Sequence, residues 1–317
     1  MDVALHLRFD DPALAEEFAS VFGGRGESSG PAVRQMRAFL ESDSGQPGYG
    51  SLRVEDGLAD PAAFLLAFSS PSMPVRPMAS PDPEWTRVGL EGDPEPLFLF
   101  SGEVCRFRRV PRWRRIVSHL LFLRMLRLRE DALFFHAASI ALEGKGVLLV
   151  GPKGAGKSTL ALALAARGHD LLGDETACYL PASLRLIPLR RPVGIKPGPQ
   201  ASAVAAALAR LSLPADEDGL VRVAAERLLG VGPATPARLE AILFLEGFGP
   251  MPNLQRVTAG RDELARLQPL ASSLVNRRAS ERVFAMVQLV GAAACYRLTA
   301  GDPDATARAV EELIAER

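Results

Sequence analysis

The segment GPKGAGKST, at residues 151–159, limits the possible folds of this chain more than any other feature. Its spacing matches the pattern G-x-x-x-x-G-K-[ST], in which a loop joins a strand to a helix. The apolar residues 147–150 before it are typical of a buried parallel strand, and residues 158–167 after it have the pattern of a helix ended by glycine. A strand, a glycine-rich loop and a helix in this order predict an α/β fold.

The loop residues fit the chemistry of nucleoside triphosphate binding. Glycines let successive backbone N–H groups point at phosphate oxygens, and the helix N-terminus adds about half a positive charge. Lys157 is expected to reach the β- and γ-phosphates, and the Ser158 hydroxyl to bind Mg²⁺. A glycine-rich turn without a ligand is the alternative, but such a turn requires neither the lysine nor the serine. We therefore expect ATP and Mg²⁺ as cofactors, with the nucleotide held by Gly151, Pro152, Lys153, Gly154, Ala155, Gly156, Lys157, Ser158 and Thr159.

An acidic pair, Asp174 and Glu175, lies at the end of the next expected strand, residues 170–174. A ten-residue helix rises about 15 Å, and a strand of about six residues returns roughly 20 Å, so the pair comes back level with the loop. In a right-handed crossover it lies within reach of Mg²⁺ or the γ-phosphate. An acidic turn between two strands is the alternative. Most P-loop ATPases carry their metal-binding acid farther along the chain, where the candidate here is Glu246 after the apolar residues 241–245.

Composition excludes several classes of protein. Lys plus Arg and Asp plus Glu both number 37, so there is no long-range field to gather nucleic acid or anionic lipid. The most apolar stretches, residues 116–128 and 283–296, are shorter than the ~20 residues that span a bilayer. Three scattered cysteines and an acidic N-terminus fit a cytoplasmic protein without a disulfide framework or signal peptide.

The chain of 317 residues is long enough for about two domains. We expect a smaller α+β domain of unassigned role at residues 1–110 and an α/β domain at residues 111–317. In the first domain, residues 32–40 are predicted to form a helix, and the prolines of residues 69–85 predict a surface loop or linker. Further elements are expected as a helix opening at Pro111, helices at 262–270 and 280–292, a helix with Pro303 at its first position, and strands at 97–100, 104–110, 133–142, 241–245 and 295–298.

A loop strand, a helix ending in Arg-Gly and an acidic pair after the next strand resemble the HPr serine kinase/phosphorylase family. The resemblance is closest in FFHAASIALEGKGVLLVGPKGAGKSTLALALAARGHDLLGDE, residues 134–175, and weaker in RRPVGIKPG and in CYRLTAGDPDATARAVEEL. It covers about residues 111–317 and implies a P-loop kinase domain of the HPr kinase type. The first 110 residues resemble no family that we can name.

The resemblance also implies roles for individual residues. Asp174 would be the base for the acceptor hydroxyl, and Ser158, Asp174 and Glu175 would hold the metal, although the family usually has two aspartates at the acidic pair. His136 matches the family's histidine on the strand before the loop, where it could orient Asp174, touch phosphate or be a satisfied core residue. The family's glycine-containing motif tied to the reverse, phosphorolytic reaction has no counterpart here.

In RRPVGIKPG, Lys196 or Arg191 could supply positive charge to the transferring phosphoryl group, and a solvated basic loop is the alternative. These features together predict an ATP-dependent kinase that phosphorylates a hydroxyl, in particular a serine of a protein or peptide. The competing hypothesis is a nucleotide-binding switch or scaffold that acts through a partner.

Overall fold

The computed structural model describes residues 3–9, 12, 34–42, 48–55, 74–110, 113–129, 131–216, 219–271 and 279–317. Their contacts divide the chain into two compact units, Asp2–Leu128 and Arg129–Arg317. Helix α3 belongs to the first unit, although the pattern of the sequence predicts that it opens the second. No helix in the described ranges is long and apolar enough to cross a membrane.

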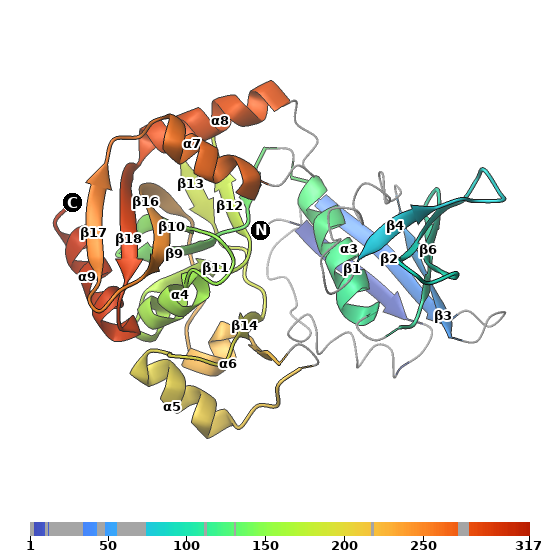
Figure 1. Cartoon of the computed structure of the whole chain (residues 1–317), viewed down its shortest axis with the longest axis horizontal. Helices are drawn as coiled ribbons and strands as arrows, with labels where there is room; N and C mark the ends of the chain where they lie inside the picture. Colours follow the sequence, from blue (N-terminus) through green and yellow to red (C-terminus); the bar gives the residue numbers. More distant parts are fainter. Residues whose placement is uncertain are drawn as a thin grey trace. The chain divides into compact units, whose positions relative to one another are not determined.

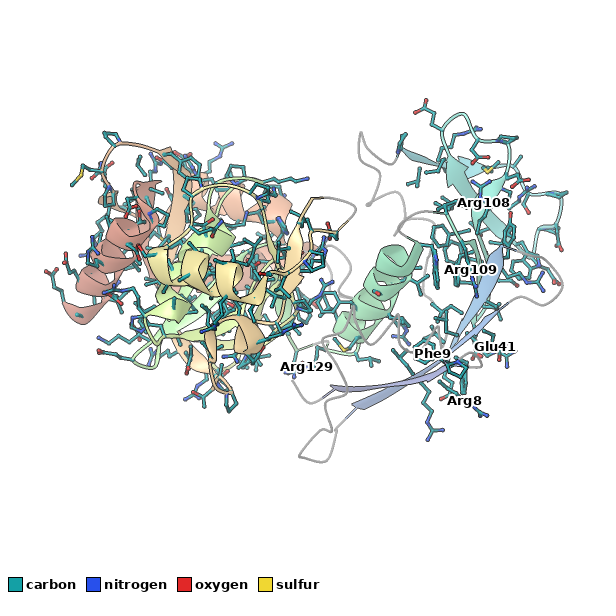
Figure 2. All side chains as sticks on the ribbon, turned by 90° about the horizontal axis from the view of Figure 1, so that it is seen from below. Arg8, Phe9, Glu41, Arg108, Arg109 and Arg129 are labelled. Carbon is teal, nitrogen blue, oxygen red and sulfur yellow. The ribbon has the colours of Figure 1, made fainter. Side chains whose placement is uncertain are left out.

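The first unit contains a seven-stranded sheet in the order β1-β2-β3-β7-β6-β5-β4. Only the pair β1 and β2 is parallel. Arg108 on β7 pairs with Asp93 and Glu95 of the turn before β6, and Figure 2 labels this arginine. The elements of the unit are β1 (Val3–Phe9), β2 (Arg34–Ser42), β3 (Tyr49–Val54), β4 (Val75–Met78), β5 (Thr86–Leu90), β6 (Pro96–Ser101), β7 (Val104–Arg108) and α3 (Trp113–Arg127).

The helix predicted at residues 32–40 is wrong, because residues 34–42 form strand β2. Its buried residues, Ala38 and Leu40, alternate with the exposed Arg37 and Glu41, which is the two-residue period of a strand.

The proline-rich segment at residues 69–85 is also not wholly a loop. Its residues 75–78 form β4, the strand at one edge of the sheet. Proline is tolerated there because an edge strand has one side that needs no ladder hydrogen bond. Residues 69–73 lie outside the described ranges.

The second unit is built on a nine-stranded mixed sheet, whose main path is β11-β9-β10-β16-β13-β12-β8. Strand β18 pairs with β16, and β17 pairs with β18, while β14 and β15 form a separate two-stranded sheet. The strands are β8 (Leu133–Phe135), β9 (Ala138–Leu142), β10 (Lys145–Val150), β11 (Asp170–Gly173), β12 (Ala177–Leu180), β13 (Arg185–Ile187), β14 (Val193–Ile195), β15 (Val221–Val223), β16 (Ala237–Phe248), β17 (Asn253–Val257) and β18 (Ala294–Ala300). The helices are α4 (Lys157–Ala166), α5 (Ser202–Leu211), α6 (Ala225–Leu229), α7 (Arg261–Leu267) and α8 (Ala279–Ala292), together with α9 (Pro303–Ala315) and a 3₁₀ turn (Gln268–Leu270).

Two hydrophobic clusters cover the two faces of this sheet. Helices α4, α5, α6 and α9 pack on one face, and α8 with the end of α7 packs on the other (Figure 1). Strand β10 contributes Val147 and Leu149 to the first cluster and Leu148 and Val150 to the second. Burial of both faces confirms the expected buried strand before the glycine-rich loop, and its parallel neighbour is β16.

Candidate active site

The glycine-rich loop and the acidic pair lie at the same edge of the second unit's sheet. Strand β9 is antiparallel to both β10 and β11, so β10 and β11 run in the same direction. The loop follows the carboxyl end of β10, and Asp174 follows the carboxyl end of β11. Ligands of α/β sheets bind at the carboxyl ends of strands, which makes this edge the candidate site.

Glycine is required at several loop positions for different reasons. Gly154 and Gly156 have φ of 89° and 93°, the left-handed region that favours glycine. At Gly151, an added Cβ would lie 2.8 Å from the carbonyl oxygen of Leu245 on β16, too close for a side chain. The sequence therefore forms a tight loop whose backbone turns directly into the first turn of α4.

Lys157 is the first residue of α4 and is only 8% exposed. Its Nζ donates to the carbonyl oxygens of Gly151 at 2.7 Å and of Pro152 at 3.0 Å. Burial lowers the pKa of its ammonium, and the negative charges of Asp174 and Glu175 partly oppose this effect. The side chain is therefore folded over the loop, with its charge beside the carboxylates.

Asp174 is brought against the start of α4, as the crossover argument predicts. The Ser158 hydroxyl donates to its Oδ1 at 2.8 Å, while Oδ2 is buried without a hydrogen-bond partner among the described residues. The side chain is 5% exposed, and this burial raises the pKa of the carboxyl from 3.8 to about 6, although the bond from Ser158 opposes the shift. Perturbed groups of this kind are concentrated at functional sites.

Glu175 lies next to the site with an exposed side chain and a φ of 59°, which is unusual for a residue other than glycine. Its carbonyl oxygen lies 3.1 Å from Nδ1 of His136. Because a carbonyl oxygen can only accept, Nδ1 is the donor in this contact and Nε2 is left as the acceptor of the neutral ring. Partial burial and the charge of Lys157 lower the pKa of His136, which favours that neutral form.

Three further candidates from the sequence have different surroundings. Lys196 follows β14 with an exposed side chain, and its charge contributes to the lowered pKa of Lys157. Arg191 is half-buried in the segment before β14. Glu246 forms ion pairs with Arg266 at 2.9 Å and Arg297 at 3.5 Å, so its carboxylate is already matched by two cations.

The donors at this edge fit Mg²⁺ rather than a metal held wholly by protein. Among the described residues, no group of three or more His, Cys, Asp or Glu side chains is placed to hold a metal ion. Magnesium usually takes one or two carboxylates and completes its shell with water and phosphate oxygens. The Ser158 hydroxyl and the Asp174 carboxylate to which it is hydrogen-bonded through Oδ1 meet that requirement.

One residue beside the loop is not among the site residues predicted from the sequence. Phe248, the last residue of β16, is 68% exposed, and a Cβ placed on Gly156 would lie 3.3 Å from its ring. Its only signal in the sequence is an aromatic residue at the end of an apolar strand. That signal does not indicate that β16 is the parallel neighbour of β10.

No protein-family model matches this chain, and no curated protein matches it. Among solved structures, the chain is similar to one described as the Hpr(Ser) kinase/phosphatase from Coxiella burnetii. The similarity has 14% sequence identity and a TM-score of 0.28, and covers 58% of this chain and 99% of the other. A likeness this weak carries no argument about the activity of this chain.

Proposed function

We propose that this protein is an ATP-dependent kinase that transfers the γ-phosphoryl group to a hydroxyl, in particular to a serine of a protein or peptide. The observation that carries the proposal is the carboxylate of Asp174, buried beside the glycine-rich loop and hydrogen-bonded to Ser158. Binding of a nucleotide alone requires no buried carboxylate with a raised pKa. Transfer to a hydroxyl benefits from one, because the hydroxyl must lose its proton.

The properties of Asp174 suit a general base. A pKa of about 6 leaves the carboxylate mostly ionised at pH 7, yet more basic than that of a surface aspartate. Ser158 fixes the orientation of the side chain through Oδ1, so Oδ2 is the atom proposed to accept the proton of the acceptor hydroxyl. Such a base typically contributes about 10² to 10⁴ in rate.

The other residues are proposed to bind and orient the triphosphate. Backbone N–H groups of the loop and of the first turn of α4 would hold the phosphates, and Lys157 would exchange its two loop carbonyls for phosphate oxygens. Mg²⁺, held by Ser158 and Asp174 with assistance from Glu175, would supply neutralisation of the phosphate charge. Lys196 would add positive charge at the γ-phosphate, and His136 would hold the backbone of Glu175 in place.

The test compares Asp174→Asn with Asp170→Asn, which removes a carboxylate from the other end of the same strand. Binding of MgATP is measured by calorimetry, and transfer by incubation with γ-labelled ATP and the candidate acceptor proteins encoded beside its gene. We expect Asp174→Asn to retain MgATP binding, because its amide still offers an oxygen to Mg²⁺ and the loop still holds the phosphates, and to lose about 10² to 10⁴ in transfer rate, because an amide is no base. Asp170→Asn is expected to behave as wild type in both measurements.

Transfer by Asp174→Asn at the wild-type rate would show that this residue is not the base. If the wild-type protein releases label only as free phosphate, the kinase assignment fails and the switch or scaffold hypothesis is favoured. Absence of MgATP binding by the wild-type protein would overturn the nucleotide site itself.

A further inference from the structure

The position of Phe248 follows from an irregularity in β16. Along this strand Leu243 and Leu245 face the cluster that contains α4, whereas Ile242 and Phe244 face the cluster that contains α8. Strict alternation would direct residue 248 to the α8 face, together with residues 242 and 244.

The pairing of β16 with β18 shifts between Leu245 and Gly247, which is a β-bulge. Gly247 has a φ of 151°, a conformation that favours glycine. A bulge changes which face the following side chains take. Phe248 consequently lies against Gly156 on the side of α4 and is an exposed residue.

An exposed apolar side chain is ordinary by itself, so the location of Phe248 carries the argument. Strands β10 and β16 are parallel, and their carboxyl ends therefore lie at the same edge. In the order β11-β9-β10-β16, Asp174 lies on one side of the glycine-rich loop and Phe248 on the other. A nucleotide with its metal-bound phosphates near Asp174 can extend its nucleoside toward Phe248.

We propose that Phe248 is the platform on which the base of the bound nucleotide stacks. The proposal rests on the function proposed above, because it takes the glycine-rich loop as the site of the triphosphate. An aromatic ring offers a base a flat apolar face, and such stacking is tolerant of the identity of the base. The bulge at Gly247 serves this site by turning the ring toward the loop.

The chain offers a matched control for this proposal. Met251 lies in the connection between β16 and β17, shortly after Phe248, and is 72% exposed, similar to Phe248. Truncating either side chain removes exposed apolar atoms and little packing. We compare Phe248→Ala, Phe248→Tyr and Met251→Ala with the wild-type protein in calorimetric titrations. Two ligands are used, MgATP and magnesium tripolyphosphate, which has the three phosphates but no base.

The wild-type protein is expected to bind MgATP more tightly than magnesium tripolyphosphate. Phe248→Ala should weaken MgATP binding by about tenfold or more and leave tripolyphosphate binding unchanged. Phe248→Tyr keeps the aromatic face and should retain wild-type affinity for both ligands. Met251→Ala should also match the wild-type protein.

The remaining outcomes separate this inference from the proposed function. Equal weakening of both ligands by Phe248→Ala would mean that the ring supports the loop, and an unchanged MgATP affinity would mean that it contacts no base. Either result overturns the platform and leaves the phosphate site in place. A wild-type protein that binds neither ligand would overturn the proposed function, and the platform with it.

Discussion

The carboxylate of Asp174 is held in surroundings that disfavour its charge. Burial raises its pKa to about 6, and the nearby charge of Glu175 adds to the effect, while the hydrogen bond from Ser158 opposes it. A buried charge without full compensation lowers stability, and such costs are usually found where a protein needs the group for function. The cost can be measured, because it depends on pH.

The folded protein binds the proton of Asp174 more tightly than the unfolded chain, whose aspartate has its ordinary pKa near 3.8. Between these values the folded state holds more protons, so this group's contribution to stability is lost as the pH rises toward 6 and above. The amide of Asp174→Asn cannot ionise, so the variant should not lose this part of its stability as the pH rises. From pH 4.5 to pH 8, the stability of the variant relative to wild type should therefore rise by about 2 kcal/mol.

Urea unfolding at the two pH values measures this difference. Any packing cost of the amide is the same at both and cancels. A stability difference for Asp174→Asn that is constant with pH would contradict the raised pKa.

At the scale of elements, the loop between β10 and α4 depends on backbone conformations that other residues disfavour. Gly154 in the loop and Gly168 after α4 have φ of 89° and 96°, and an added Cβ would meet nothing within 4 Å at either position. Alanine at either site therefore changes the conformational preference of the backbone without causing a clash. The two positions differ in role, because the backbone at Gly154 belongs to the proposed phosphate-binding loop and the backbone at Gly168 ends helix α4.

We expect Gly154→Ala to weaken MgATP binding by about tenfold, because a left-handed conformation costs an alanine roughly 1–2 kcal/mol and the exposed loop can relax away from it. Gly168→Ala should lower the free energy of unfolding by about 1 kcal/mol and leave MgATP affinity unchanged, since it ends the helix away from the phosphates. Calorimetric titration and urea unfolding of both variants measure the two effects. Equal losses of affinity would argue against a specific role for the loop.

Elements with a strong local signal could be predicted from the sequence. Residues 147–150 are apolar without interruption, and the helix after the loop ends at a glycine, so β10 and α4 were both expected and are confirmed. The segment at residues 32–40 has apolar residues that fit a helical and a strand period alike. Its pairing with β1 and β3 made it a strand, and that pairing is tertiary information.

Some residues of the candidate site could likewise be predicted from the sequence, and others could not. The closeness of Asp174 to Ser158 could be predicted because one helix and one strand set the distance between them. Phe248 could not be identified, since its place depends on the parallel pairing of β16 with β10 and on a bulge that reverses its face. The alternation of apolar and polar residues along one strand predicts neither the pairing nor the bulge.

At the scale of the whole molecule, each unit has its own sheet. The two hydrophobic clusters that cover the nine-stranded sheet consist only of residues from the second unit. The two tryptophans, Trp85 and Trp113, both belong to the first unit. Trp113 stacks on Phe107 of β7, with ring centroids 5.1 Å apart. Tryptophan fluorescence is therefore a probe of the first unit alone.

We expect the full chain to unfold in two transitions, because each unit is compact by itself. MgATP at about 100 times its dissociation constant should stabilise the second unit by about 2.7 kcal/mol, which raises the corresponding transition by roughly 5–10 °C. Differential scanning calorimetry should show this shift, while the transition seen by tryptophan fluorescence stays in place. Magnesium without nucleotide is the control. An equal shift of both transitions would mean that the two units unfold together. A shift seen only by fluorescence would mean that the nucleotide binds the first unit, which would contradict the proposed site.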